Sequence, residues 1–161
     1  LEIVQPYRSR FKENRDEYVN RARKLLETVG LAGNEGKFPW ELSGGMQQRA
    51  SICRALVHDP ELLMLDEPFG ALDAFTREEL WQVLRDIWQE RRFTVVLVTH
   101  DLREATFLAD TGYCMSKRPG KIIARKEIDL PRPRDIELTY SERFTEIVHE
   151  LRAHIGRVRK G

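Results

Sequence analysis

The sequence contains few cysteines and no long hydrophobic run. Its two cysteines, Cys53 and Cys114, lie far apart and form no CxxC pair, so neither a disulfide framework nor a zinc site is indicated. The longest apolar segments have the length of a β-strand, which is far short of a membrane span. These absences favour a globular protein of a reducing compartment whose contact with any membrane is peripheral.

An excess of charge of one sign is also missing. Lys and Arg total 27 against 26 Asp and Glu, so the net charge is +1. Proteins that bind nucleic acid usually carry a basic surface, and the net charge therefore gives no case for nucleic acid as the main partner. With 161 residues and 41% hydrophobic content, the chain can bury the core of one domain or of two small lobes.

The sequence has no phosphate-binding loop of the form GxxxxGK[ST]. The segment "GLAGNEGKF" contains Gly36 and Lys37, but Leu31 stands where the motif requires glycine, and Phe38 where it requires Ser or Thr. The segment also follows a predicted helix instead of a strand. We interpret it as a connector.

Hydrophobic periodicity predicts alternating helices and strands. Helices are expected at Arg15 to Val29, Ser43 to about Leu56, along "AFTREELWQVLRDIWQER", at Asp101 to Ala109 and from Glu137 to about Ile155. Buried parallel strands are expected at Leu62 to Leu65 and Thr94 to Thr99, and a hairpin around Tyr113 to Lys117 and Lys121 to Ile128. This order is typical of an α/β fold.

The stretch "ELSGGMQQR" opens a predicted helix with Ser43, Gly44 and Gly45. A serine hydroxyl can donate a hydrogen bond, glycines let backbone amides approach an anion, and the helix dipole adds about half a positive charge. An ordinary helix cap followed by loop glycines is the alternative interpretation. The stretch therefore predicts either a phosphate site or a simple cap.

Acidic and imidazole side chains follow the two predicted parallel strands. Asp66 and Glu67 come directly after the first strand, and His100 ends the second. Open α/β folds place their sites at the carboxyl ends of parallel strands, so these side chains are expected at one sheet edge. Adjacent strand residues face opposite ways, which suits one Mg²⁺ ligand and one group that orients a water. A solvated acidic turn and a structural histidine are the alternatives.

Taken together, "LSGGMQQR", "LLMLDEPFGALD" and "VTHDLREATFLAD" closely resemble, in order and spacing, the ATP-binding subunits of ABC transporters. The resemblance covers nearly the whole chain. It implies the C-terminal part of an ABC-type nucleotide-binding domain, an α/β fold with a P-loop NTPase-like parallel sheet and a helical subdomain, lacking the Walker A region. The implied parts are a helical subdomain with the signature motif at 1–57, the ATPase α/β core at 58–130, and a C-terminal linker and helix at 131–161.

The resemblance also implies residue roles, with ATP and Mg²⁺ as cofactors. Glu67 matches the catalytic glutamate, His100 the switch histidine, and Asp66 the Walker B aspartate that holds the metal. In this family two subunits pack head to tail, and the signature helix of one caps the γ-phosphate of ATP held by the other. The signature motif and the D-loop fall on Ser43, Gly44, Gly45, Gln47 and Asp73. Without a Walker A loop, the isolated chain is expected to bind ATP poorly and to hydrolyse it negligibly.

The tail "MSKRPGKIIARKEIDLPRPRD" resembles importers of the nitrate, sulfonate and taurine group. This implies a subunit that energises uptake of a small solute, cytoplasmic and peripheral on the inner face of the cell membrane. The implied partners are a second ATP-binding subunit, transmembrane permease subunits and, indirectly, a solute-binding protein. One alternative is a soluble ABC-type ATPase acting on DNA or ribosomes, against which "THDLREATFLAD" and the near-neutral charge argue. The other is a catalytically silent fragment that serves as an interaction surface.

Overall fold

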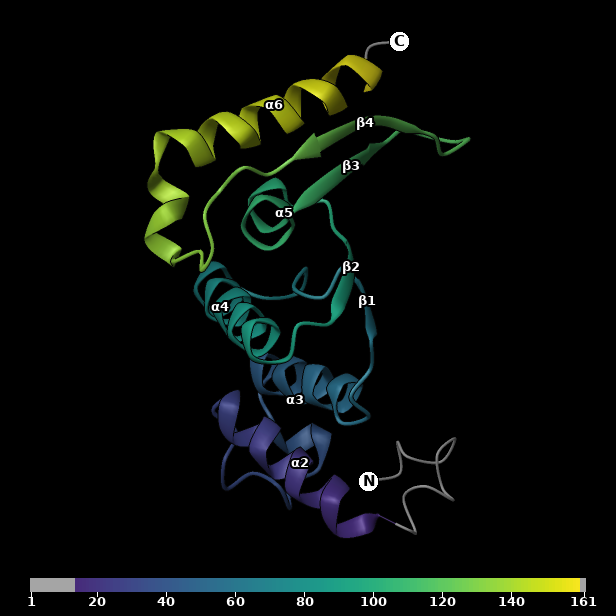
Figure 1. Ribbon diagram of the computed structural model, residues 1–161. Helices are drawn as coiled ribbons and strands as arrows, with labels where there is room; N and C mark the ends of the chain where they lie inside the picture. Colours follow the sequence, from purple (N-terminus) through teal and green to yellow (C-terminus); the bar gives the residue numbers. More distant parts are fainter. Residues whose placement is uncertain (1–13, 160–161) are drawn as a thin grey trace.

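A computed structural model describes residues 14–159 of the chain, so residues 1–13 of the predicted helical subdomain lie outside it. Figure 1 shows α2 and α3 at one end of the molecule, β1, β2 and α4 in the middle, and α5, β3, β4 and α6 at the other end. None of the helices within the described residues is both long and apolar enough to cross a bilayer.

The first two helices, α2 (Arg15–Thr28) and α3 (Gly44–Leu56), confirm their predicted positions and pack on each other. Leu25 and Cys53 are buried between their apolar faces. α2 ends because Gly30 adopts the left-handed region, with a φ of +72°, and its N–H donates to the Glu27 carbonyl. The short 3₁₀ helix η2 (Pro39–Glu41) precedes the Ser43 cap of α3.

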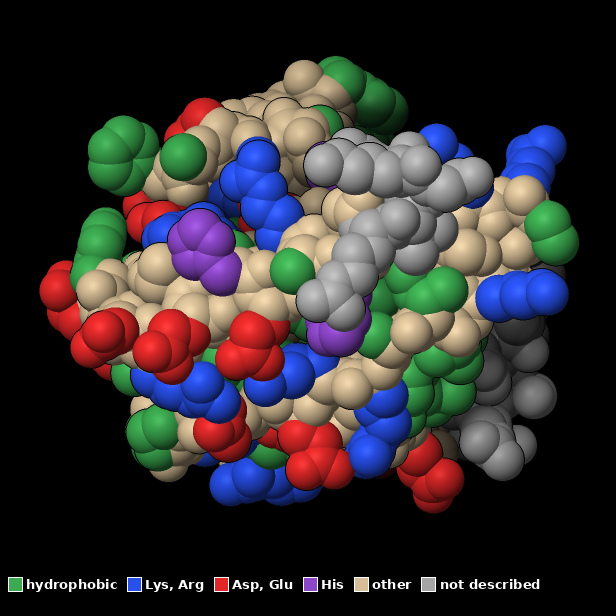
Figure 2. Space-filling view, turned by 90° about the horizontal axis from the view of Figure 1, so that it is seen from above, with side chains coloured by type: hydrophobic (Ala, Val, Ile, Leu, Met, Phe, Trp, Pro, Cys, Tyr) green, Lys and Arg blue, Asp and Glu red, His purple; other side chains and the backbone are tan. Residues whose placement is uncertain are grey.

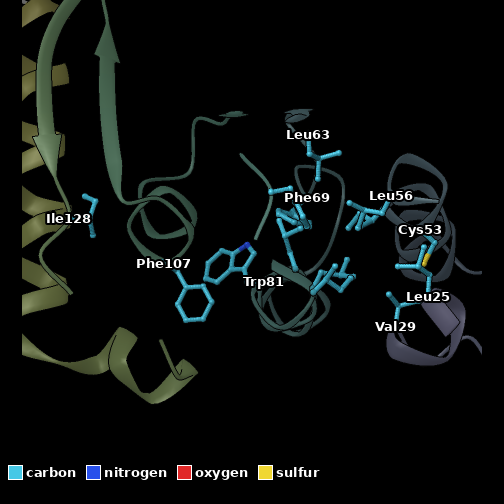
Figure 3. Close-up of a cluster of buried hydrophobic side chains, with 14 of the residues drawn as sticks. Leu25, Val29, Cys53, Leu56, Leu63, Phe69, Trp81, Phe107 and Ile128 are labelled. Atoms are coloured by element: carbon cyan, nitrogen blue, oxygen red, sulfur yellow. The ribbon is translucent and has the colours of Figure 1, made fainter. Parts of the chain in front are cut away.

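A β-α-β unit forms the middle of the molecule. β1 (Leu62–Asp66) and β2 (Thr94–Val98) are parallel, as predicted, and α4 (Ala74–Arg91) connects them. Leu62 pairs with Thr94 and Asp66 with Val98. Leu63 of β1 and Trp81 of α4 belong to one buried cluster that extends from α2 to α5 (Figure 3). The apolar stripe of α4 therefore covers one face of the strand pair.

The other face of β1 and β2 is exposed among the described residues, and the expectation of fully buried strands is wrong there. Leu63 is 4% exposed, whereas its neighbours Leu62 and Met64 are 50% and 71% exposed. Val96 and Val98 of β2 are exposed on the same face. A continuous apolar run predicts that both faces of the strand pair are packed against other elements. Within residues 14–159, only one face is packed in this way.

The second half of the chain begins with α5 (Leu102–Leu108), as predicted. It continues with the antiparallel hairpin of β3 (Thr111–Met115) and β4 (Ile122–Glu127), which confirms the predicted hairpin. This hairpin is a sheet of its own and does not pair with β1 or β2.

The last helix, α6 (Glu142–Arg159), starts later than the predicted Glu137, and a 3₁₀ turn, η3 (Ile136–Tyr140), precedes it. Ser141 is extended, with a ψ of 152°, and its Oγ accepts from the Phe144 N–H, so Ser141 separates the two. Phe144 and Ile147 dock α6 as predicted. Seen from above, the molecule carries interleaved acidic and basic side chains (Figure 2).

The proline-marked segment 129–135 contains a buried cation. Arg134 is 1% exposed, and burial lowers the pKa of its guanidinium to about 10. The guanidinium donates to four backbone carbonyls at the end of α5 and after β4, those of Thr106, Phe107, Ala109 and Ile128. This residue thereby attaches the segment before η3 to the end of α5.

Candidate functional site

The paired ends of β1 and β2 bring two of the predicted site residues into contact. The Glu67 N–H donates to the Val98 carbonyl at 2.8 Å, a hydrogen bond that closes the pair of Asp66 and Val98 at the end of the two strands. Nδ1 of His100 donates to Oε2 of Glu67 at 2.5 Å. Because the strands are parallel and in register, the residues that follow them lie at one sheet edge.

The backbone of Glu67 differs from the predicted strand geometry. β1 ends at Asp66, and Glu67 has a φ of +47°, in the left-handed region. The direction of the Glu67 side chain is therefore set by the turn after β1. It is not set by the alternation of side chains between the two faces of a strand. A left-handed residue other than glycine costs on the order of 1 kcal/mol. The Gly70 N–H bond to the Glu67 carbonyl and the buried Phe69 hold this turn.

The pair of Glu67 and His100 is open to solvent, since the side chains are 43% and 79% exposed. The hydrogen bond from His100 to Glu67, together with the carboxylate charge, raises the pKa of His100 above its ordinary value. A carboxylate within hydrogen-bond reach of an imidazole can orient a water and accept its proton. The geometry thus suits general-base chemistry on a bound ligand.

Asp66 lies at the exposed end of β1, and no described residue forms a hydrogen bond or ion pair with its carboxylate. Among residues 14–159, no group of three or more His, Cys, Asp or Glu side chains could enclose a metal ion. A free carboxylate of this kind fits Mg²⁺, which keeps several waters and takes one or two carboxylates plus phosphate oxygens.

The N-terminus of α3 combines a cap with open amides. Ser43 Oγ accepts from the Met46 N–H at 3.3 Å, and Gln47 Nε2 donates to the Leu42 carbonyl at 3.0 Å. The first amides of a helix have no acceptor within it, so those of Gly44 and Gly45 can face an anion. The two interpretations of this stretch are therefore compatible.

The N-terminus of α3 also lies against the first turn of α4. Asp73 caps α4, since its carboxylate accepts from the Thr76 N–H at 3.0 Å and from Thr76 Oγ1 at 2.6 Å. These bonds lower the pKa of Asp73 below its ordinary value. A Cβ built on Gly45 would lie 2.8 Å from Thr76 Cγ2. Thr76 therefore links the signature stretch to Asp73.

The predicted site residues thus form two groups in this structure. One is the N-terminus of α3 with Asp73, and the other is the pair of Glu67 and His100 at the sheet edge. Within residues 14–159, no hydrogen bond or ion pair joins Ser43 to either member of that pair.

Replacing Gly45 with alanine is expected to destabilise the protein by about 1–2 kcal/mol, because the added methyl displaces Thr76 from its bond to Asp73. The second change Thr76→Ser removes the clashing methyl and keeps the hydroxyl. The double variant should therefore recover most of the lost stability in urea unfolding. Equal stability of Gly45→Ala and the parent protein would contradict this packing.

Comparisons with known proteins identify the family. A family model described as ABC transporter matches residues 3–70. The aliphatic sulfonates import ATP-binding protein SsuB of Bacillus licheniformis is 54% identical over 111 residues, which are 69% of this chain and 44% of that protein. The chain belongs to the ABC transporter family. The taurine import ATP-binding protein TauB of Yersinia pestis is 47% identical over 78% of this chain and 45% of its own length.

The fold agrees with this family. A solved structure described as an inward-facing conformation of an ABC transporter assigned to the metal-chelate type matches with a TM-score of 0.61 and 27% identity. The match covers 81% of this chain and 48% of that one, which confirms the α/β fold with a parallel sheet. The chain spans about half the length of the curated relatives it matches, between 44% and 52%.

One acidic residue beside the site is buried, and the ABC transporter motifs give no indication of this burial. Glu104, in the first turn of α5, is 2% exposed and hydrogen-bonds to Thr99. Burial raises the pKa of Glu104 to about 7. Acidic residues are common in the exposed first turn of a helix, so nothing in the local sequence indicates that this carboxyl group is buried.

The raised pKa of Glu104 predicts a pH-dependent stability. The pKa of Glu104 lies above its ordinary 4.5 in the folded state. Its contribution to the free energy of unfolding is therefore fully present below pH 4.5, where the carboxyl group is protonated in both the folded and unfolded states. This contribution is lost as pH rises through about 7, because the buried group must then give up its proton. Glu104→Gln keeps the shape and removes the titration. Above pH 7 the variant should be more stable than the parent protein by on the order of 1–3 kcal/mol.

Urea unfolding at pH 5 and pH 8 measures this difference. Glu137→Gln is the matched control, because Glu137 is exposed and its side chain has no partner among the described residues. We expect the control to follow the parent protein at both pH values. A constant difference between Glu104→Gln and the parent protein would contradict the raised pKa.

Proposed function

We propose that this chain is part of the ATP-hydrolysing subunit of an importer. The contact between Glu67 and His100, 2.5 Å at the ends of two parallel strands, carries the proposal. Glu67 orients the water that attacks the γ-phosphate and accepts its proton, and His100 keeps Glu67 in place. Asp66 would hold Mg²⁺, which would neutralise charge on the phosphates.

The N-terminus of α3 serves the nucleotide of a second subunit in this proposal. Ser43, Gly44 and Gly45 present a hydroxyl and free amides to the γ-phosphate, with Gln47 in the same turn, and Asp73 lies at the same interface. The separation of this group from Glu67 and His100 supports a site shared between two copies packed head to tail. Each copy then supplies one half to each of two sites.

The relatives suggest the solute and the other partners. Proteins named for the import of aliphatic sulfonates and of taurine are 47–54% identical to this chain. We therefore propose a small sulfonate-type solute, transmembrane permease subunits as direct partners and a solute-binding protein as an indirect one. The subunit would lie in the cytoplasm on the inner face of the membrane. Uptake of radiolabelled taurine and alkanesulfonates by cells lacking this subunit tests the solute class.

A mixing experiment tests the shared site, in a subunit of the full length of the relatives. Ser43→Arg blocks the phosphate-facing end of α3, and Glu67→Gln removes the base. Each variant alone should be inactive. In a mixed dimer, one site combines the intact Glu67 of one copy with the intact Ser43 of the other. A one-to-one mixture should recover about a quarter of the ATPase activity, since half the dimers are mixed and each has one intact site.

Recovery after mixing would support both the ATPase function and the shared site. No recovery would mean that Ser43 and Glu67 act in the same subunit. The parent protein must hydrolyse ATP in the same assay, and its failure to do so would overturn the ATPase proposal itself.

A further inference from the structure

Arg77, in the first turn of α4, joins the two segments that carry predicted site residues. Its Nη1 lies 2.7 Å from Oδ2 of Asp101, and its Nη2 donates to the Leu72 carbonyl at 3.1 Å. Leu72 directly precedes Asp73, and Asp101 directly follows His100. One guanidinium therefore contacts the loop before α4 and the segment after β2.

The ion pair between Arg77 and Asp101 is largely shielded from water. The two side chains are 27% and 22% exposed, and Arg77 Nε is buried without a hydrogen-bond partner among the described residues. The planar guanidinium reaches both acceptors at once, which a lysine ammonium on a flexible stem does less well. The contact is therefore specific to arginine in its geometry as well as its charge.

Asp101 holds the backbone on both sides of itself. Its Oδ1 accepts from the N–H groups of Arg103 and Glu104, at 2.8 and 3.2 Å, and so begins α5. Its own N–H donates to Thr99 Oγ1 at 3.0 Å. The residues before and after His100 are thereby anchored, and the remaining oxygen of Asp101 is the one bound to Arg77.

Arg77 is fixed in turn by the group at the N-terminus of α3. Its backbone N–H donates to the Asp73 carbonyl at 3.0 Å, while the Asp73 carboxylate binds the neighbouring Thr76. Thr76 packs against Gly45. A continuous series of contacts thus runs from Gly45 through Thr76 and the first turn of α4 to Asp101.

We propose that Arg77 is a positioning residue that couples the loop before α4 to the segment holding His100. A displacement of Asp73 by the partner subunit would then move His100 relative to Glu67. The inference rests on the proposed function, because it names how one nucleotide site affects the other. A purely structural role for the ion pair predicts lower stability with unchanged chemistry.

Steady-state ATP hydrolysis by the full-length subunit separates these two roles. In Arg77→Ala, kcat should fall about tenfold while KM for ATP changes less than about twofold, because positioning affects the transition state more than binding. Arg77→Lys should recover part of the loss. Arg91→Ala is the matched control, since Arg91 lies at the other end of α4 in an ion pair with Asp59, 3.6 Å away. It should keep the parent kcat.

A double variant tests whether Arg77 acts through Asp101. Asp101→Asn keeps the oxygen that caps α5 and removes the charge that faces Arg77. If the two residues act as a unit, Arg77→Ala combined with Asp101→Asn should lose about as much activity as either change alone. If the two residues act independently, their losses multiply, and the double variant should lose about a hundredfold in activity. That result would overturn the coupling.

Amide hydrogen exchange without nucleotide supplies a readout independent of activity. Exchange of residues 100–104 should accelerate in Arg77→Ala and stay unchanged in Arg91→Ala. If the parent subunit hydrolyses ATP and Arg77→Ala keeps its kcat, the inference fails while the proposed function stands. If the parent subunit lacks ATPase activity, the proposed function fails instead. Should Arg77→Ala not fold, Arg77→Lys and Asp101→Asn carry the same comparisons.

Discussion

Replacement of Glu67 by glutamine in the full-length subunit should lower ATP hydrolysis by about 10²- to 10⁴-fold and leave ATP binding intact. The amide cannot accept the proton of the attacking water, yet it has nearly the size of the carboxylate. Glu67 also accepts from His100 Nδ1 at 2.5 Å, and this hydrogen bond, together with the carboxylate charge, raises the pKa of His100. In the variant, the pKa of His100 should therefore fall toward its ordinary value.

Three measurements check this prediction: steady-state hydrolysis, equilibrium binding of ATP, and the NMR titration of His100. Glu61→Gln is the matched control, because Glu61 is an exposed glutamate next to the opposite end of the same strand. The control should resemble the parent protein in all three measurements. Turnover at the parent rate in Glu67→Gln would remove the assignment of Glu67 as the base.

Arg134→Met should destabilise the protein by roughly 3–5 kcal/mol, because the variant leaves buried carbonyls without a donor. The guanidinium is 1% exposed and donates to four backbone carbonyls. Its pKa of about 10 means that it is protonated at neutral pH, so the lost bonds are charge-assisted. Methionine fills much of the same space and offers no donor.

Urea unfolding at pH 7 measures this loss. Arg143→Met is the control, since Arg143 pairs with Asp129 on the surface and is 41% exposed. Solvent screens such a pair, so its removal should change stability far less. A similar effect of both substitutions would contradict a structural role for the carbonyl contacts of Arg134. We expect hydrogen exchange at the end of α5 to accelerate only in Arg134→Met.

Local signals in the sequence were sufficient for most of the elements. The cap at Ser43, the glycine after α2 and the apolar stripe of α4 involve residues within four positions of one another, so a short window contains them. The three motifs also identify the ABC transporter family, and the comparisons confirm this. Because β1 and β2 were predicted to be parallel, an edge shared by Glu67 and His100 could be expected, and the structure places them in contact.

Tertiary structure alone decided which charged side chains are buried and what they bind. Arg77 meets Asp101 across 24 residues, and Arg134 meets the end of α5 across 25 to 28. Glu104 is buried although its position in a first helical turn is usually exposed. The roles assigned to the site residues stay predictions, since they concern a nucleotide, a metal ion and a second subunit. These residues are Ser43, Gly44, Gly45, Gln47, Asp66, Glu67, Asp73 and His100.

The exposed face of β1 and the left-handed backbone of Glu67 have the same kind of cause. The apolar run from Leu62 to Leu65 indicates that this strand is favoured in a buried position. The packing of other elements decides which face of β1 is actually buried. The turn after Asp66 depends on the pairing with β2 and on the buried Phe69. Sequence determined the elements and the family through short-range periodicity and motif spacing, whereas burial and ion pairing required distant segments to meet.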